Sequence, residues 1–175
     1  MFNKSRIYQQ VEHFHQVFGH PTHQHQVTNT DSESLRVLRG RLDFIAEEFF
    51  ELLTSILGPE QVKPVEEAYQ QNIQVTPGSP KDAVEFTDAL ADLVFLIYGT
   101  AATYGIPLDD ALDEVYASNM SKLGADGKPI YRDGDGKILK GPHYAPPRIR
   151  DVLNTGGALY QPQPGTTPGK ETPGE

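Results

Sequence analysis

Residues 31–58 read DSESLRVLRGRLDFIAEEFFELLTSILG and carry the longest helical pattern of the chain. Apolar residues recur every three or four positions without a break, which is the spacing of one face of an α-helix. These positions are Leu35, Leu38, Leu42, Ile45, Phe49, Leu52 and Ile56. Asp31 and Ser32 provide an N-cap, and Gly58-Pro59 ends the pattern. A long helix with such a seam of apolar residues predicts lengthwise packing in a helical bundle.

Further helical patterns lie on both sides of this stretch. Residues 4–18 carry one apolar face, and residues 60–71 can form a short helix. Residues 81–104 are apolar nearly all round, which is typical of a central helix covered on several sides. Pro107 restarts the chain as another helix that reaches about Leu123. We therefore predict an all-α fold with an up-and-down four-helix bundle-like core.

The end of the chain has a different composition. Turn glycines in Asp126-Gly127 and Asp133-Gly134 flank a short apolar segment and predict a small C-terminal hairpin within residues 124–141. From about residue 155, Gly, Pro, Thr and Gln dominate, which is too little apolar material to fold. We predict one domain over residues 1–154 and a disordered tail over residues 155–175.

The composition restricts the function classes. A net charge of −9 argues against a general nucleic-acid or membrane-surface binder, which normally presents a basic face. Without cysteine there is neither a disulfide framework nor a zinc–thiolate site. The N-terminal residues lack the apolar run of a signal peptide, and the apolar stretch 93–107 is too short to span a membrane. We expect a cytoplasmic protein without nucleic-acid or membrane partners.

Two acidic clusters lie inside these apolar patterns. One is E-E-F-F-E at residues 47–51, and the other is E-F-T-D-A-L-A-D at residues 85–92. Each motif alone is most often a solvated helix face. Their combination beside apolar faces favours a metal site, because buried carboxylates are usually paired or coordinate a metal. Pairing with Arg36, Arg39 or Arg41 is the alternative. Ligation by carboxylates alone selects a hard cation, Mg²⁺ or Mn²⁺.

The E-x-x-D of Glu85 and Asp88, following E-E-x-x-E, resembles the signature of the all-α nucleoside triphosphate pyrophosphohydrolases. This MazG-like superfamily includes dimeric dUTPases and phosphoribosyl-ATP pyrophosphohydrolase. The segments around residues 88–93, 97–101, 118–123 and 140–142 are also similar to its phage and bacterial branch. The resemblance covers roughly residues 5–150 and implies Mg²⁺-dependent hydrolysis between the α and β phosphates. The insert between the two motifs is longer than usual, and either Asp88 or Asp92 can be the family's metal-binding aspartate.

The hypothesis that follows is hydrolysis of a (deoxy)nucleoside triphosphate, dUTP or a related dNTP, to monophosphate and pyrophosphate. Phosphoribosyl-ATP is an alternative substrate, and a non-catalytic helical interaction module is the alternative from another class. In this hypothesis Glu47 is the catalytic residue that orients or deprotonates the attacking water. The metal ligands would be Glu48, Glu51, Glu85, Asp88 and Asp92.

The resemblance places Asn119 and Lys122 near the nucleotide, and Lys140 lies in the one locally basic stretch. An amide can contact a base edge, and a lysine can contact a phosphate. Ordinary capping of a helix C-terminus explains Asn119 and Lys122 equally well. The apolar faces of residues 35–56 and 86–102 exceed what one chain can readily cover, which predicts a homodimer or homotetramer.

Overall fold

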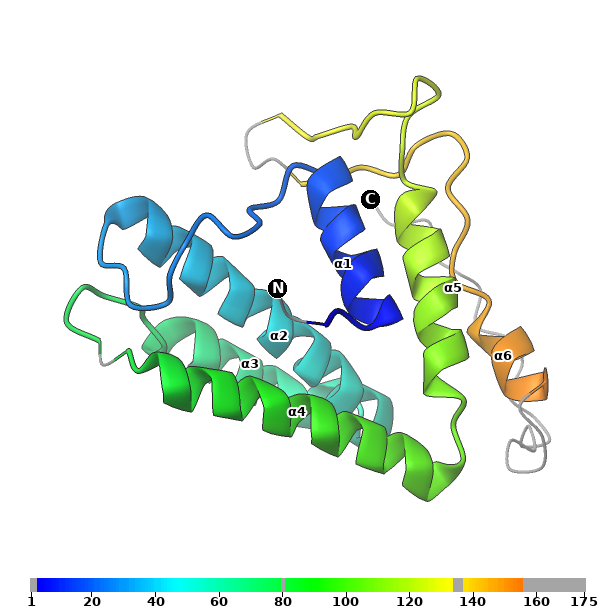
Figure 1. The fold of residues 1–175 in the computed structure, drawn as a ribbon. Coiled ribbons are helices and arrows are strands. Elements are labelled where there is room, and N and C mark those ends of the chain that lie inside the picture. Colours follow the sequence, from blue (N-terminus) through cyan, green and yellow to red (C-terminus); the bar gives the residue numbers. More distant parts are fainter. Residues whose placement is uncertain (1–2, 80, 134–136, 156–175) are drawn as a thin grey trace. The chain divides into compact units, whose positions relative to one another are not determined.

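The computed structural model describes residues 3–79, 81–133 and 137–155, and these residues contain six α-helices (Figure 1). The helices are α1 (Arg6–Val17), α2 (Ser32–Leu57), α3 (Pro59–Asn72), α4 (Ala83–Tyr104), α5 (Leu108–Met120) and α6 (Ile149–Thr155). The predicted all-α fold class is confirmed, since the described residues contain no β-strand beyond one isolated bridge. The predicted tail lies outside the described residues except for Thr155, which ends α6.

The chain divides into two compact units. One comprises residues 1–22 and 93–175, and the other comprises residues 23–92. Helix α4 belongs to both, because the boundary falls between Asp92 and Leu93.

In the first unit, α1 packs on α5. The Asp113 carboxylate of α5 accepts a hydrogen bond from Gln10 at 2.8 Å and forms an ion pair with Arg6. His13 shares a 2.7 Å hydrogen bond with the Tyr116 hydroxyl. These polar contacts lie between the two helices and fix how α1 is seated on α5.

The segment that follows α5 is bound back onto it. Arg148 donates two hydrogen bonds to the Glu114 carboxylate, at 3.1 and 2.7 Å. This pairing lowers the pKa of Glu114. The predicted hairpin is present as one antiparallel bridge between Tyr131 and Ile138. The Tyr131 hydroxyl donates to the carbonyl of Phe18, which is 1% exposed, so the hairpin is also tied to the end of α1.

In the second unit, α2 packs on α3. Helix α2 begins as the sequence predicts: the Asp31 carboxylate accepts a hydrogen bond from the backbone N–H of Ser34 at 2.9 Å. This bond lowers the pKa of Asp31. Phe50 of α2 and Val62 of α3 are buried in this unit.

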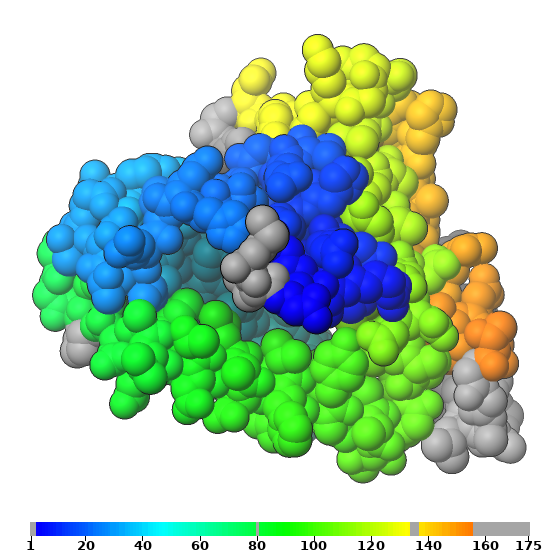
Figure 2. All heavy atoms as spheres, viewed as in Figure 1, coloured from blue at the N-terminus to red at the C-terminus, as the bar shows by residue number. Residues whose placement is uncertain are grey.

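The prediction that residues 81–104 form a covered central helix is wrong for the single chain. Ala101 is the only residue of α4 that is buried, whereas Phe95 and Leu96 are 78% and 65% exposed. Figure 2 shows α4, in green, uncovered along this face of the molecule. The apolar seam of α2 is also partly open, with Leu52 at 54% and Ile56 at 72% exposure. The reason is that the face of α2 that packs on α3 carries Phe50 and not the seam.

By length and composition alone, α4 could cross a membrane, and it is the one helix of the described residues that meets both criteria. Helices that are buried in other proteins meet them as well, so this is weak evidence for a membrane location. In the single chain, Phe95 and Leu96 give α4 an exposed apolar surface.

Candidate active site

The acidic cluster of α2 faces the groove between α2 and α3. Glu47 lines two adjoining pockets in this groove, with volumes of about 430 and 460 Å³. Glu51 lines the second pocket, and Glu66 of α3 lines both. Glu48 projects about 100° further round the helix than Glu47 and lines neither pocket. The structure therefore places Glu47 and Glu51 of the E-E-x-x-E motif at the groove and Glu48 on a different face of α2.

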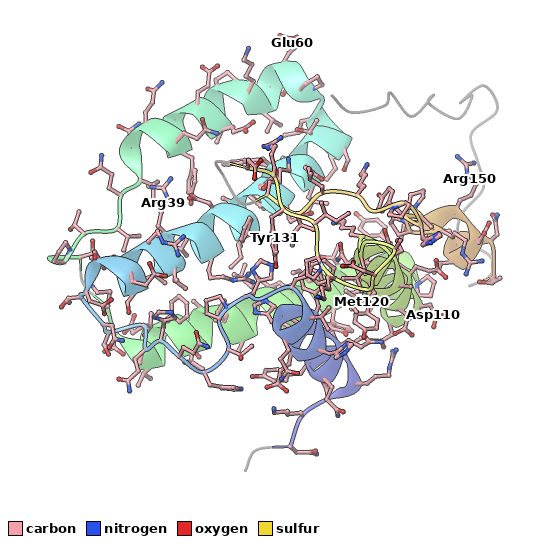
Figure 3. All side chains as sticks on the ribbon, turned by 90° about the horizontal axis from the view of Figure 1, so that it is seen from above. Arg39, Glu60, Asp110, Met120, Tyr131 and Arg150 are labelled. Atoms are coloured by element: carbon pink, nitrogen blue, oxygen red, sulfur yellow. The ribbon has the colours of Figure 1, made fainter. Side chains whose placement is uncertain are left out.

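The far end of this groove is held by a hydrogen-bonded cluster. Arg39 donates to the Asp43 carboxylate at 2.7 Å, and the Tyr69 hydroxyl donates to the same oxygen at 3.1 Å. Arg39 also donates to the backbone carbonyl of Ile73, which ties α2 to the end of α3. Burial and the bond to Asp43 raise the pKa of Tyr69, so its hydroxyl stays a proton donor. Figure 3 shows Arg39 in the space between α2 and α3.

The acidic cluster of α4 lies on an exposed helix. Glu85, Asp88 and Asp92 are all exposed, and no ion pair is recorded for any of them among the described residues. Within those residues, no group of three or more His, Asp or Glu side chains is arranged to hold a metal ion. The five metal ligands thus remain a prediction from the sequence.

For the acids of α4, the alternative of arginine pairing is not supported by the recorded contacts of the three arginines. Arg36 pairs with Glu33 at 2.7 Å, and Arg39 pairs with Asp43. The Arg41 guanidinium lies 5.6 Å from the centre of the Phe44 ring, and burial lowers its pKa. Since these partners lie outside the two acidic motifs, the acids of α4 are not held in place by these arginines.

We expect the substitutions Asp88→Asn and Asp92→Asn to leave the metal-free protein as stable as the wild type or more stable. Each removes a like charge from a helix on which no ion pair is recorded for these acids. The measurement is thermal unfolding in EDTA, followed by circular dichroism. A large fall in melting temperature would instead reveal a stabilising partner for the lost carboxylate.

The predicted substrate-binding residues of the first unit lie close together. The Lys122 ammonium donates to the Asn119 amide oxygen at 2.8 Å. The residue after Lys140, Gly141, donates its backbone N–H to the carbonyl of Lys122 at 3.0 Å. Lys140 itself lies 4.5 Å from the centre of the Tyr144 ring. The backbone of the returning chain, next to Lys140, therefore lies against the end of α5 at Lys122.

Gly141→Ala should destabilise this arrangement. A β-carbon at residue 141 would lie 2.6 Å from the carbonyl carbon of Leu123 and 2.8 Å from the carbonyl oxygen of Lys122. Because both are backbone atoms, the segment must shift, and we expect a loss of about 2 kcal/mol in unfolding free energy. Urea denaturation measures it. Gly40→Ala is the matched control: its β-carbon has open space, and alanine favours the helix by up to about 1 kcal/mol.

Comparison with known proteins identifies the family. The family model for phosphoribosyl-ATP pyrophosphohydrolase matches residues 11–119, which is more than half of the chain. The chain belongs to the phosphoribosyl-ATP pyrophosphohydrolase family. A crystal structure from Exiguobacterium sp. 255-15, provisionally named an NTP pyrophosphohydrolase, is similar with a TM-score of 0.64 and 27% identity. That similarity covers 87% of this chain and 96% of the other.

A curated relative is much longer. The uncharacterized protein L479 of Acanthamoeba polyphaga mimivirus is 28% identical over 109 residues, or 61% of this chain. These residues make up 34% of L479, so the chain matches about a third of that relative's length. The family and the structural likeness together place this chain in the MazG-like all-α superfamily of nucleoside triphosphate pyrophosphohydrolases.

Part of the groove between α2 and α3 was not predicted from the sequence. The first of the two pockets is lined by four residues that belong to neither acidic motif: Asp43, Glu66, Tyr69 and Gln70. One signal was present: Asp43 precedes Glu47 by one helical turn and so shares its face. No comparable signal marks α3, because its contribution depends on how it packs against α2.

Proposed function

We propose that this pyrophosphohydrolase hydrolyses a deoxynucleoside triphosphate, dUTP or a related dNTP, to the monophosphate and pyrophosphate with Mg²⁺. The observation that carries the proposal is the pair of acidic motifs on α2 and α4 in a chain of this family. The name of the Exiguobacterium protein supports a nucleoside triphosphate as the substrate class.

The donor chemistry fits a hard divalent cation. Glu51, Glu85, Asp88 and Asp92 offer carboxylate oxygens, and none of the four has a recorded ion pair among the described residues. With Glu48 they make an all-oxygen set, which suits Mg²⁺ or Mn²⁺. Bound there, the cation would offset phosphate charge and lower the pKa of an attacking water. Since the acids are not gathered around one point, binding requires them to move together.

The protein's own groups then have distinct tasks. Glu47, which faces the groove, would accept a proton from the attacking water or orient it. Lys122 and Lys140 would contact phosphate oxygens, while Asn119, already hydrogen-bonded to Lys122, would hold that lysine or contact the base.

Phosphoribosyl-ATP is the second candidate substrate, because the family model carries that description. It contains the same triphosphate linkage, so the same acids would serve either reaction. The two differ in the group attached to the base, and substrate competition distinguishes them.

Product analysis tests the proposal. The protein is incubated with Mg²⁺ and a panel of ribo- and deoxynucleoside triphosphates, with phosphoribosyl-ATP alongside, and the products are separated by chromatography. We expect monophosphate and pyrophosphate, with no turnover in EDTA and recovery on adding Mg²⁺ or Mn²⁺. A diphosphate with orthophosphate would contradict the mechanism.

A further inference from the structure

The groove between α2 and α3 has the size of a ligand site. Its two pockets share Glu47, Phe50 and Glu66, so they form one continuous depression. Their volumes of about 430 and 460 Å³ lie within the range of roughly 300–1,000 Å³ that is typical of small-molecule sites. Both walls belong to the same compact unit.

One end of the groove is aromatic and held rigidly. The rings of Phe50 and Tyr69 meet edge to face, with centroids 5.7 Å apart. The Arg39 guanidinium lies 5.4 Å from the centre of the Tyr69 ring and is held in place by Asp43. Each of these four residues lines the pocket. Such a preorganised surface costs little to order when a flat aromatic ligand binds.

Two polar side chains beside this aromatic surface make no recorded side-chain hydrogen bond within the described residues. Glu66 and Gln70 project from α3 into the pocket, and none of the recorded side-chain hydrogen bonds of the described residues involves either. A carboxylate accepts hydrogen bonds, and an amide both donates and accepts them. Together they can contact the polar edge of a heterocyclic base or a sugar hydroxyl.

The charges of the groove determine which part of a nucleotide can enter. Asp43, Glu47 and Glu66 outnumber the one cation, Arg39. A phosphate chain would meet net negative charge there, whereas an uncharged nucleoside would not. The phosphates would therefore extend toward Glu51 and the metal, at the other end of the groove.

We propose that the groove between α2 and α3 binds the nucleoside part of the substrate, with the Tyr69 ring, supported by Phe50, against the base and Gln70 and Glu66 at its polar edge. This inference rests on the proposed function for the position of the phosphates. Asp43 lies four residues before Glu47, or about 6 Å along the helix axis, so the base sits one turn from the reacting centre. In the sequence, α3 lies between the two acidic motifs and contains neither of them. In this proposal α3 determines base preference but supplies no metal ligand.

Gln70→Ala is the main test, with Gln71→Ala as its matched control. Gln71 is the next residue of α3 and lines neither pocket. We expect Gln70→Ala to raise KM about tenfold for the preferred nucleotide, the effect of one lost hydrogen bond, with kcat nearly unchanged. It should also alter the ratio of kcat/KM between bases. Gln71→Ala should match the wild type.

The stacking surface is tested separately. Tyr69→Ala should raise KM by about tenfold or more, because it removes the ring on which the base would stack. If both the Gln70 and Tyr69→Ala variants fold and keep KM and base preference within twofold, the inference is overturned.

Binding without catalysis separates this inference from the proposed function. The metal-free protein is titrated calorimetrically with deoxyuridine, deoxycytidine, deoxyadenosine and deoxyguanosine. Binding of at least one that Gln70→Ala weakens about tenfold supports the groove as a nucleoside site, even if no triphosphate is hydrolysed. Absence of binding by all four, or binding unaffected in Gln70→Ala, contradicts it even if hydrolysis is observed.

Discussion

Glu51→Gln should reduce turnover at least about a hundredfold and weaken Mg²⁺ binding in parallel. Mutating a residue that merely orients a metal ligand typically costs about 10- to 100-fold in metal affinity or activity, and Glu51 is proposed as a ligand itself. Glutamine preserves the shape of the side chain but removes its charge, so the fold should be unaffected at this exposed position. Calorimetric titration with Mg²⁺ and measured pyrophosphate release give the two quantities.

Glu47→Gln provides the contrast on the same helix. If Glu47 acts on the water, its loss should lower kcat by roughly 10²- to 10⁴-fold while Mg²⁺ affinity stays near that of the wild type. Glu48→Gln should instead behave like Glu51→Gln. Equal Mg²⁺ affinity in all three variants would contradict the assignment of roles.

Ile97→Glu should convert an oligomer into an inactive monomer. Ile97 is 53% exposed in the single chain, within a run of exposed apolar residues on α4 that extends from Leu93 to Tyr98. An apolar surface of this kind marks an interface, and a charge buried there without a partner costs several kcal/mol. We propose that a second copy of the chain covers it, and that the active site depends on this association.

Light scattering coupled to size-exclusion chromatography measures the result at micromolar protein concentration. Gln71→Glu introduces the same charge on the exposed side of α3 and should change neither mass nor turnover. An active wild-type monomer would contradict the assembly proposal and leave the metal chemistry unaffected. Partition of the wild type into lipid vesicles would show that a membrane, and not a second copy, covers α4.

The sequence predicts the helices better than it predicts what covers them. The cap at Asp31 and the stop at Gly58 are local signals, and both ends of α2 agree with them. Seven-residue α6 was missed because so short a helix has no periodic pattern to detect. The burial of α4 was predicted incorrectly because apolar composition shows that a surface needs a partner but not whether the same chain supplies it.

The candidate site shows a similar division. The acidic motifs could be found from residue type and spacing, whereas Asn119 and Lys122 were indicated by the resemblance to the family and Lys140 by a locally basic stretch. The groove could not, since Tyr69 faces Asp43 only after α3 folds back on α2. Contacts between residues 26 positions apart leave no periodic trace in either segment.

One wall of the groove is encoded by a single uninterrupted stretch, Pro59–Asn72. For laboratory evolution this means that one short synthetic cassette can randomise Glu66, Tyr69 and Gln70 together, while every codon of the two acidic motifs is left untouched. Selection from such a library would explore substrate preference with the hydrolytic apparatus held constant. Chimaeras that exchange only this segment between relatives would sample the same variation as it occurs in nature.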